Sequence, residues 1–539
     1  MTYYVDEKTG RGPYRKKGNS GQPNILMISF DMVPREFYLP LKGDLVPRTP
    51  NIDKLKGDGL FFSNAYAVSP LCSPSRAALF TGRYSYIVAN NERSHDGQEM
   101  HIRENDTIFP EYLRSAGYRT RHFGKCHVGA HKYLAAFGEN DAPWDRWSPP
   151  WYDDDGYLEM LRSLNADRFK FIREIRGMPL SPGGRGNFLG GWVSTEDGKP
   201  FPKEGSYPYY TTNLALAELR RHKSGKPFYL QLDYFEPHQP FFIPSGYEER
   251  EKELREELSA SGFIAHNSTR GNAADSGRGE PLIYARYRRY WGIYDKRTME
   301  DYLVANVLQY EILDEQIGRI LGCLEEELYD DTLIALVSDH GEMNCRDGLI
   351  DKGAFLNPRV LQVPIYLKLP AFSPAGGSGR RGTVCDSLRS LLDLAPTILD
   401  AAGIEALDRF DGESLLNGGT NEGIKDGTCG ETNEGKGNRK LMAEVFSHVL
   451  PNPAACLLRE GGGETEMYTI NFSDCVDEYF RRLRDGSWAR AFSCPDDILK
   501  DMLAFFDADA RWASYASYLR VIHPHIDGSS GDLTKFVVS

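Results

Sequence analysis

Residues 24–31 have the sequence NILMISFD, a nearly continuous apolar run that ends in an aspartate. A short apolar run of this kind is typical of a strand that is buried on both faces, as in a parallel sheet. Similar runs recur at residues 228–232, 333–337 and 364–369. Helical patterns alternate with them, at residues 108–116, 212–222 and 300–328. This alternation predicts an α/β fold in which ligands bind at the carboxyl ends of the strands.

Length and charge restrict the class of protein. The chain has 539 residues, enough for one large domain with a smaller unit attached. Its 64 Lys and Arg against 77 Asp and Glu give a formal charge of −13, which argues against a nucleic-acid partner. No stretch approaches the roughly 20 apolar residues that a membrane span requires, so we expect no membrane partner either.

The sequence changes in character near its C-terminal quarter. A segment rich in Gly, Asn and Thr at residues 417–439 predicts a flexible loop. Strand-like runs follow at residues 441–447, 454–459 and 466–471, and then an amphipathic helix at residues 496–519. We therefore predict four segments: a polar extension over 1–22, a catalytic domain over 23–416, the loop, and a C-terminal α+β subdomain with an antiparallel sheet over 440–539. Two insertions, at residues 141–156 and 250–289, are expected to be surface loops.

The N-terminus and the cysteines indicate a compartment. Residues 1–22 are polar and basic and lack the apolar core of a secretory signal. The nine cysteines are scattered and contain no C-x-x-C pair, a pattern typical of free thiols in a reducing environment. Together these features predict a cytoplasmic protein.

The most specific motif is PLCSPSRAALFTGR at residues 70–83. Cys72 precedes a run of small residues that predicts a helix, and Arg76 follows one turn later. A cysteine at a helix N-terminus beside an arginine has a lowered pKa, so Cys72 is a candidate nucleophile. A buried structural cysteine is the alternative interpretation.

Three further groups follow predicted strands. Asp31 ends the first strand, and Asp339 and His340 lie in VSDHGE after the strand at 333–337. The carboxyl ends of parallel strands meet at one edge of a sheet, where such side chains could hold a divalent cation. Other candidate residues lie in FGKCHVG (Lys125 and His127), in PHQPF (His238) and in DKG (Lys352).

Together, these six motifs resemble the type I sulfatases of the alkaline phosphatase superfamily, in family order from residue 24 to about residue 403. The resemblance implies an alkaline-phosphatase-like α/β sandwich with a mostly parallel sheet. It also implies that a formylglycine-generating enzyme reads Pro74 and Arg76 and oxidises Cys72 to formylglycine, whose hydrate is the nucleophile. The metal ligands that it implies are Asp31, Cys72, Asp339 and His340. The catalytic residues that it implies are Cys72, Arg76, Lys125, His127, His238 and Lys352.

Some positions depart from the common sulfatase pattern. Met32 stands where many arylsulfatases have a second aspartate, His340 where they often have asparagine, and Cys126 where a tryptophan is usual. The Asp-His pair is more similar to choline sulfatases and phosphonate monoester hydrolases. Calcium is the metal that the resemblance implies first, and manganese is the alternative because it accepts nitrogen ligands more readily.

Three functions are compatible with these residues. The first is a sulfatase for a small sulfate ester, and the second is a phosphonate monoester or phosphodiester hydrolase with the same site. The third, a silent binding protein on the same scaffold, is disfavoured because no expected site residue is missing. Aromatic residues beside carboxylates in the insertion 141–156 could cage a cationic or sugar leaving group, or could pin the loop to the core. These aromatic residues are Trp144, Trp147, Trp151 and Tyr152, and Asn91 is a further candidate for substrate contact.

Overall fold

A computed structural model describes most of the chain. The described residues are 15–16, 21–85, 102–103, 105–138, 149, 151–222, 225–271, 279–325, 327–372, 381–406, 409–416, 439–461, 464–474, 476–491, 493–508 and 512–526. The predicted loop at 417–439 falls almost entirely outside them, so the loop and the segment boundaries beside it stay predictions. Asn91, Trp144 and Trp147 also lie outside the described residues.

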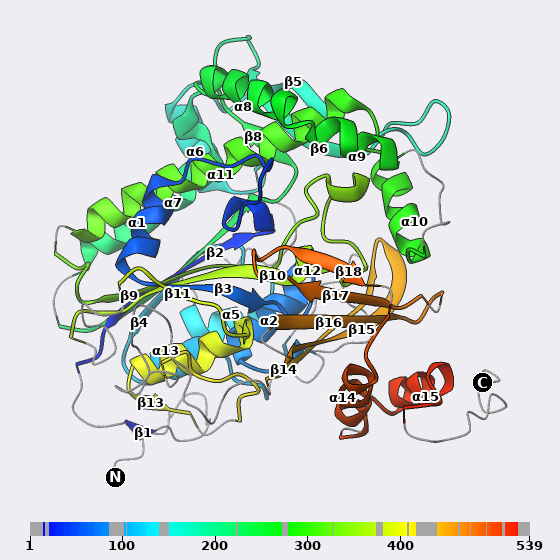
Figure 1. The fold of residues 1–539 in the computed structure, drawn as a ribbon. Helices are drawn as coiled ribbons and strands as arrows, with labels where there is room; N and C mark the ends of the chain where they lie inside the picture. Colours follow the sequence, from blue (N-terminus) through cyan, green and yellow to red (C-terminus); the bar gives the residue numbers. More distant parts are fainter. Residues whose placement is uncertain are drawn as a thin grey trace.

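An eight-stranded sheet forms the centre of the molecule (Figure 1). The strands are β2 (Asn24–Asp31), β3 (Leu60–Tyr66), β4 (Arg119–Gly124), β7 (Phe228–Pro237), β9 (Thr332–Ser338), β10 (Gln362–Lys368), β11 (Thr383–Cys385) and β12 (Arg389–Ser390). Their order is β11-β3-β10-β9-β2-β7-β4, with β12 also paired to β3. β2 runs parallel to β7 and β9, and β10 alone is antiparallel to its neighbours. The predicted mostly parallel sheet is therefore confirmed.

Helices cover both faces of this sheet, which explains why β2 is apolar at successive positions. On one face Leu26 and Ile28 pack against α1 (Pro50–Asp58), α7 (Tyr207–Arg221) and α11 (Lys296–Glu325). On the other, Ile25 and Met27 pack against α2 (Cys72–Thr81), α4 (Phe109–Ser115), α5 (Ala130–Phe137) and α13 (Leu394–Ala401). These four side chains of β2 are fully buried. The burial of each contributes about 1.5–3 kcal/mol to the free energy of unfolding.

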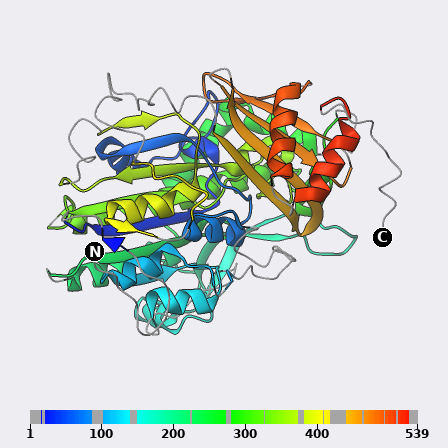
Figure 2. The same cartoon turned by 90° about the horizontal axis from the view of Figure 1, so that it is seen from below.

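The C-terminal region forms a second sheet, in which each strand pairs antiparallel with the next strand along the chain. Its five strands are β14 (Lys440–His448), β15 (Leu450–Gly461), β16 (Glu464–Asn471), β17 (Glu478–Arg482) and β18 (Trp488–Ala491). One face packs on α10 (Leu282–Trp291), and the other packs on α14 (Asp496–Asp507) and α15 (Ala513–Ile522) (Figure 2). The antiparallel subdomain is as predicted, with two strands beyond the three expected.

Two sequence predictions about local structure are wrong. The helix expected over 496–519 is two helices, α14 and α15, and Phe506 at the end of the first stacks on Trp512 at the start of the second. The loop expected over 250–289 contains most of α8 (Glu248–Ser261), all of α9 (Phe263–Gly271) and most of α10. Leu254 and Leu258, one helical turn apart, bury the inner face of α8.

A smaller sheet of β5 (Phe169–Arg176), β6 (Phe188–Thr195) and β8 (Phe241–Ile243) lies beside the core. Trp151 packs on Phe242 of β8, with 5.2 Å between ring centroids, so this part of the 141–156 insertion is pinned to the core. The remaining elements are β1 (Arg15–Lys16), η1 (Arg35–Phe37), α6 (Asp155–Ser163), η3 (Lys203–Gly205), η5 (Arg346–Gly348), α12 (Pro358–Leu361), η7 (Leu391–Asp393) and β13 (Ile404–Glu405).

Two further expectations concern membranes and thiols. Among the described residues, no helix combines the length and the apolar character needed to cross a membrane. Cys72, Cys345, Cys456 and Cys494 carry thiols. Cys385 is disulfide-bonded, so the prediction that all nine cysteines are free thiols is wrong there, because sequence spacing does not show which sulfurs meet in the fold.

Gly124, at the end of β4, offers a test of how the sheet positions the residues that follow it. Its φ is +98°, and a Cβ there would lie 1.9 Å from the carbonyl oxygen of Asp233. Gly117 has a similar φ of +95° with open space around it. Gly117→Ala should lower the free energy of unfolding by about 1–2 kcal/mol, the cost of a left-handed backbone. Gly124→Ala should lower it by about 1–3 kcal/mol more, because the Cβ overpacks β7.

Denaturant unfolding of the two variants measures this difference. Equal losses of unfolding free energy would contradict the close approach of β4 to β7 at Gly124.

Candidate active site

The site begins where α2 begins. Cys72 lies in the first turn of α2, and every residue of this helix is buried. Pro74 is tolerated there because the first N–H groups of a helix have no partner within the helix. The helix ends at Gly82, whose left-handed φ of 63° closes the last turn. Because Cys72 is the first residue of α2, its side chain lies near the partial positive charge of the helix N-terminus.

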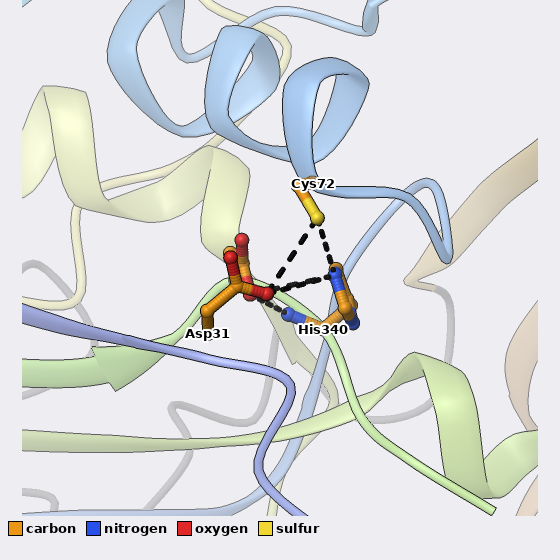
Figure 3. A group of neighbouring side chains, drawn as sticks. Asp31, Cys72 and His340 are labelled. Atoms are coloured by element: carbon orange, nitrogen blue, oxygen red, sulfur yellow. Dashed lines mark hydrogen bonds and ion pairs between the residues drawn. The ribbon is translucent and has the colours of Figure 1, made fainter. Parts of the chain in front are cut away.

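Four potential metal ligands converge below this helix end. Asp31 comes from the end of β2, Cys72 from α2, and Asp339 and His340 from the residues after β9. One donor atom of each lies within 4.8 Å of the others, and all four residues are buried. Cys72 Sγ is 3.5 Å from Asp31 Oδ1 and 3.2 Å from His340 Nε2 (Figure 3).

The chemistry of these donors fits a divalent cation. His340 Nδ1 lies 3.0 Å from the carbonyl oxygen of Gly341, so a proton on Nδ1 leaves the Nε2 lone pair directed at the group. Burial and the negative charge of Asp31 raise the pKa of Asp339. A cation between two buried carboxylates would remove this repulsion, which supports a metal site at Asp31, Cys72, Asp339 and His340.

Two cationic side chains lie against the same carboxylates. Arg76 Nε donates to Asp339 Oδ2 at 2.8 Å, and Lys125 Nζ donates to Asp31 Oδ2. Burial and the neighbouring Cys72 act to raise the pKa of Asp31, but Lys125 outweighs them, together with other cationic neighbours, and lowers it to about 2. Asp31 is therefore ionised at neutral pH.

The surroundings of Cys72 favour its thiolate. Burial opposes ionisation, but the positive charges of Lys125 and Lys352 hold the pKa of Cys72 well below its usual value. His340 and a hydrogen bond with His127 act in the same direction. Cys456, buried in the second sheet without such charges, has a raised pKa instead. Cys72 is thus chemically distinct from a structural cysteine.

A lysine and a histidine near Cys72 contact each other. Lys352 Nζ lies 2.5 Å from His238 Nε2, and His238 Nδ1 contacts the carbonyl oxygen of Gln239. An ammonium can only donate, so Nε2 accepts and the ring proton resides on Nδ1. Burial disfavours the charged ammonium, but Cys72 and Asp351 raise the pKa of Lys352, which keeps it protonated.

The structure thus brings the predicted metal ligands and catalytic residues into one buried cluster. Sequence reasoning missed the groups that hold them. Asp233, in the middle of β7, accepts from Ser29 Oγ at 2.5 Å and contacts His122 Nε2 at 2.9 Å. Glu342 accepts from the backbone N of Asp351 at 2.7 Å. Glu342 could have been found from its place in the VSDHGE motif. Asp233 could have been found because it is a charged residue inside an otherwise apolar strand.

Residues 23–404 match the family model described as Sulfatase. The chain belongs to the sulfatase family. It is 28% identical over 402 residues to an uncharacterized sulfatase of Escherichia coli, covering 73% of this chain and 71% of that protein. It is 29% identical over 412 residues to an arylsulfatase of Clostridium perfringens, covering 73% and 78%. The buried donor group that includes Cys72 is the candidate metal site of this sulfatase-family hydrolase.

Solved structures share the sulfatase fold over nearly the whole chain. A phosphonate monoester hydrolase from Silicibacter pomeroyi superimposes with a TM-score of 0.63 at 19% identity, covering 92% of this chain and 96% of that one. A putative sulfatase from Bacteroides thetaiotaomicron gives a TM-score of 0.59 at 18% identity, covering 92% and 94%. The alkaline-phosphatase-like fold expected from the sequence is confirmed.

We expect the protein to be stabilised by a divalent cation. At a metal concentration of about 100 times Kd, binding to the folded state alone adds about 2.7 kcal/mol to the free energy of unfolding. Asp339→Asn should remove most of this gain, because a charged donor is lost. Calorimetry with and without Ca²⁺ or Mn²⁺, and elemental analysis after desalting, measure the effect.

Asp314→Asn is the matched control. Asp314 is also buried, but it accepts from the backbone of Asn51 and Ile52 instead of lying near Cys72. A metal response that Asp339→Asn retains in full would contradict the site.

Proposed function

We propose that the protein hydrolyses a small sulfate ester to an alcohol and inorganic sulfate, with Cys72 converted to formylglycine as the nucleophile. The observation that supports this most is the position of Cys72 Sγ, at a helix N-terminus, 3.5 Å from Asp31 Oδ1 and 3.2 Å from His340 Nε2. A nucleophile among metal donors and cations suits an anionic ester, since the cations offset charge that develops as the S–O bond breaks.

Asp31, residue 72, Asp339 and His340 would hold the divalent cation. We propose calcium first, and manganese as the alternative because His340 offers a nitrogen donor. A bound cation supplies Lewis-acid stabilisation of the sulfate oxygens and lowers the pKa of a nearby hydroxyl group. Arg76 holds Asp339 in place, and Lys125 is positioned to contact the sulfate from beside Asp31.

The first chemical step transfers the sulfuryl group to residue 72. One hydroxyl of the aldehyde hydrate loses its proton to solvent and its oxygen attacks sulfur, the ester S–O bond breaks, and the leaving oxygen takes a proton from the protein. The Lys352–His238 pair supplies that proton: the Lys352 ammonium carries it and donates it to His238 Nε2, 2.5 Å away. An alkyl leaving group depends on this proton most, since an alkoxide is strongly basic.

The second step regenerates the aldehyde. His127, which hydrogen-bonds to the Cys72 side chain, takes the proton from the remaining hydroxyl of residue 72. The electron pair of that O–H bond stays on the hydroxyl oxygen and forms the C=O bond. The bond between the residue 72 carbon and the sulfate oxygen breaks at the same time, and sulfate leaves. Addition of water to the aldehyde restores the hydrate, so the water of hydrolysis is consumed there and none needs to attack sulfur.

A second candidate function uses the same residues. His340 beside Asp339 is the pair that, in the sequence, is more similar to phosphonate monoester hydrolases, and a structure of one such enzyme shares the fold. A phosphate diester or phosphonate monoester is also an anion with a leaving oxygen, so the cations and the Lys352–His238 pair would serve it equally.

A formylglycine-generating enzyme is the expected partner. It would recognise Cys72, Pro74 and Arg76, all of which are buried in the folded protein. The modification therefore requires this segment before α2 is packed. The cytoplasmic location expected from the sequence stays a prediction.

Conversion of Cys72 gives the first test of the proposed function. In protein co-expressed with a formylglycine-generating enzyme, the peptide that contains residue 72 should lose about 18 Da, because oxygen replaces sulfur and two hydrogens. Sulfatase activity should rise in proportion to the converted fraction, and Cys72→Ala should abolish it. Cys456→Ala, at a buried cysteine of the second sheet, is the control that should remain active.

Parallel assays with an aryl sulfate and an aryl phosphate diester distinguish the two candidate functions. A higher kcat/KM for the diester would favour the second candidate. Full activity of protein that carries only the thiol at residue 72 would refute the formylglycine proposal for either substrate.

A leaving-group series separates the roles of the two histidines. General acid catalysis contributes roughly 10²–10⁴-fold, so His238→Ala should reduce alkyl sulfate turnover near the upper end of that range and nitrophenyl sulfate turnover far less. His127→Ala acts after the leaving group has gone, so its loss should not depend on leaving-group pKa, and a sulfated residue 72 should accumulate. The same leaving-group dependence for both variants, with no trapped sulfated protein, would show that these roles are wrong.

A further inference from the structure

Asp351 has a left-handed backbone conformation, which is uncommon for residues other than glycine. Its φ is +68°, in the left-handed region, and its side chain is only 1% exposed. The turn is held on both sides: the Asp351 N–H donates to Glu342 Oε1 at 2.7 Å, and the Asp351 carbonyl accepts from Met343 N at 3.2 Å. A strained non-glycine residue that its surroundings hold in place points to a use for its side chain.

The carboxylate of Asp351 lies between groups of the active site and the second sheet. Oδ1 is 3.7 Å from Lys352 Nζ and 3.4 Å from Gln239 Nε2. Oδ2 accepts no hydrogen bond from the described residues and faces His448 Nδ1 at 3.5 Å. The carboxylate thus touches the lysine that contacts His238, and the residue next to His238.

His448 comes from a distant part of the chain. It is the last residue of β14, and its Nδ1 lies 2.9 Å from the hydroxyl of Tyr287 on α10, which also donates to the His448 carbonyl. These contacts fix the imidazole against Asp351. His448 therefore links the antiparallel sheet to the carboxylate beside Lys352.

We propose that Asp351 is the positioning residue of the proton donor: it holds the Lys352 ammonium against His238 Nε2, and His448 of the second sheet holds Asp351. The catalytic consequence rests on the proposed sulfatase function, whereas the positioning itself does not. The contacts of Lys352 Nζ with His238 and Met32 Sδ carry no negative charge. Loss of the Asp351 carboxylate removes an anion that keeps the ammonium in this orientation.

The chain offers variants that separate this role from folding. Asparagine and glycine both tolerate a left-handed φ, so Asp351→Asn and Asp351→Gly remove the charge without adding backbone strain. Asp347→Asn is the matched control, since Asp347 has a φ of +55° in the same loop and no contact described with Lys352 or His238. Unfolding temperatures should fall in Asp351→Asn and Asp351→Gly, because Lys352 loses a buried charge partner, and should stay close to that of the unaltered protein in Asp347→Asn.

Turnover of a leaving-group series measures the consequence for the reaction. Misplacement by about 1 Å can reduce a rate about 10²-fold, so Asp351→Asn and Asp351→Gly should reduce alkyl sulfate turnover roughly 10–100-fold and nitrophenyl sulfate turnover only a few-fold. His448→Ala should give a smaller loss with the same dependence. His448→Asn should restore part of it, because the amide nitrogen replaces Nδ1. A loss that is equal for all leaving groups would overturn the proposal.

A second measurement reads the positioning without turnover. Ring ¹⁵N chemical shifts of His238, assigned with His238→Gln, should report a proton on Nδ1 and a hydrogen-bonded Nε2, and the Nε2 shift should move in Asp351→Asn but not in Asp347→Asn. An unmoved Nε2 shift in Asp351→Asn would overturn the positioning role. A moved shift in protein that hydrolyses no sulfate ester would support the positioning and refute the proposed function.

Discussion

The buried guanidinium of Arg76 is the charge around which the site is arranged. It lies 2.8 Å from Asp339, 3.7 Å from Asp31 and 3.8 Å from Asp233. These aspartates come from β2, from β7 and from the residue after β9, so one cation on α2 joins three segments of the central sheet. A buried charge is tolerated only when it is paired, and removal of one partner of a buried pair typically destabilises a protein by about 3–5 kcal/mol. The helix that carries Cys72 therefore has one favourable position on the sheet.

The parallel arrangement of the strands explains why separate motifs meet. Lys125 follows β4, His238 follows β7, and Asp339 follows β9 directly. In a parallel sheet these strand ends share one edge. Apolar runs that are each followed by polar residues therefore predict both the fold and the cluster of active-site side chains. The same argument does not extend to Asp351 and His448, which are almost a hundred residues apart and meet through the contact between two sheets. Nothing local in either segment signals that pairing.

The secondary structure missed from the sequence has related causes. β17 and β18 contain charged residues, such as Arg481 and Arg490, so neither strand shows an apolar run. In α8 the many charged side chains suggested a loop, whereas Leu254 and Leu258 alone bury its inner face. When a segment is buried on both faces, its apolar composition predicts its secondary structure. When only one face is buried, the prediction depends on two or three apolar positions.

The burial of α2 has a kinetic consequence for how much of the protein can become active. Ser75 Oγ donates at 2.5 Å to the carbonyl of Asp339, a residue 264 positions later in the chain. At a synthesis rate of roughly 5–20 residues per second, about 10–50 s pass between synthesis of Ser75 and synthesis of Asp339. Only after that interval can α2 pack in its final position. Under the proposed conversion of Cys72 to formylglycine, the modifying enzyme would have to act within this interval. Chains that fold first keep an intact fold and an unmodified thiol, so preparations of equal stability could differ widely in specific activity.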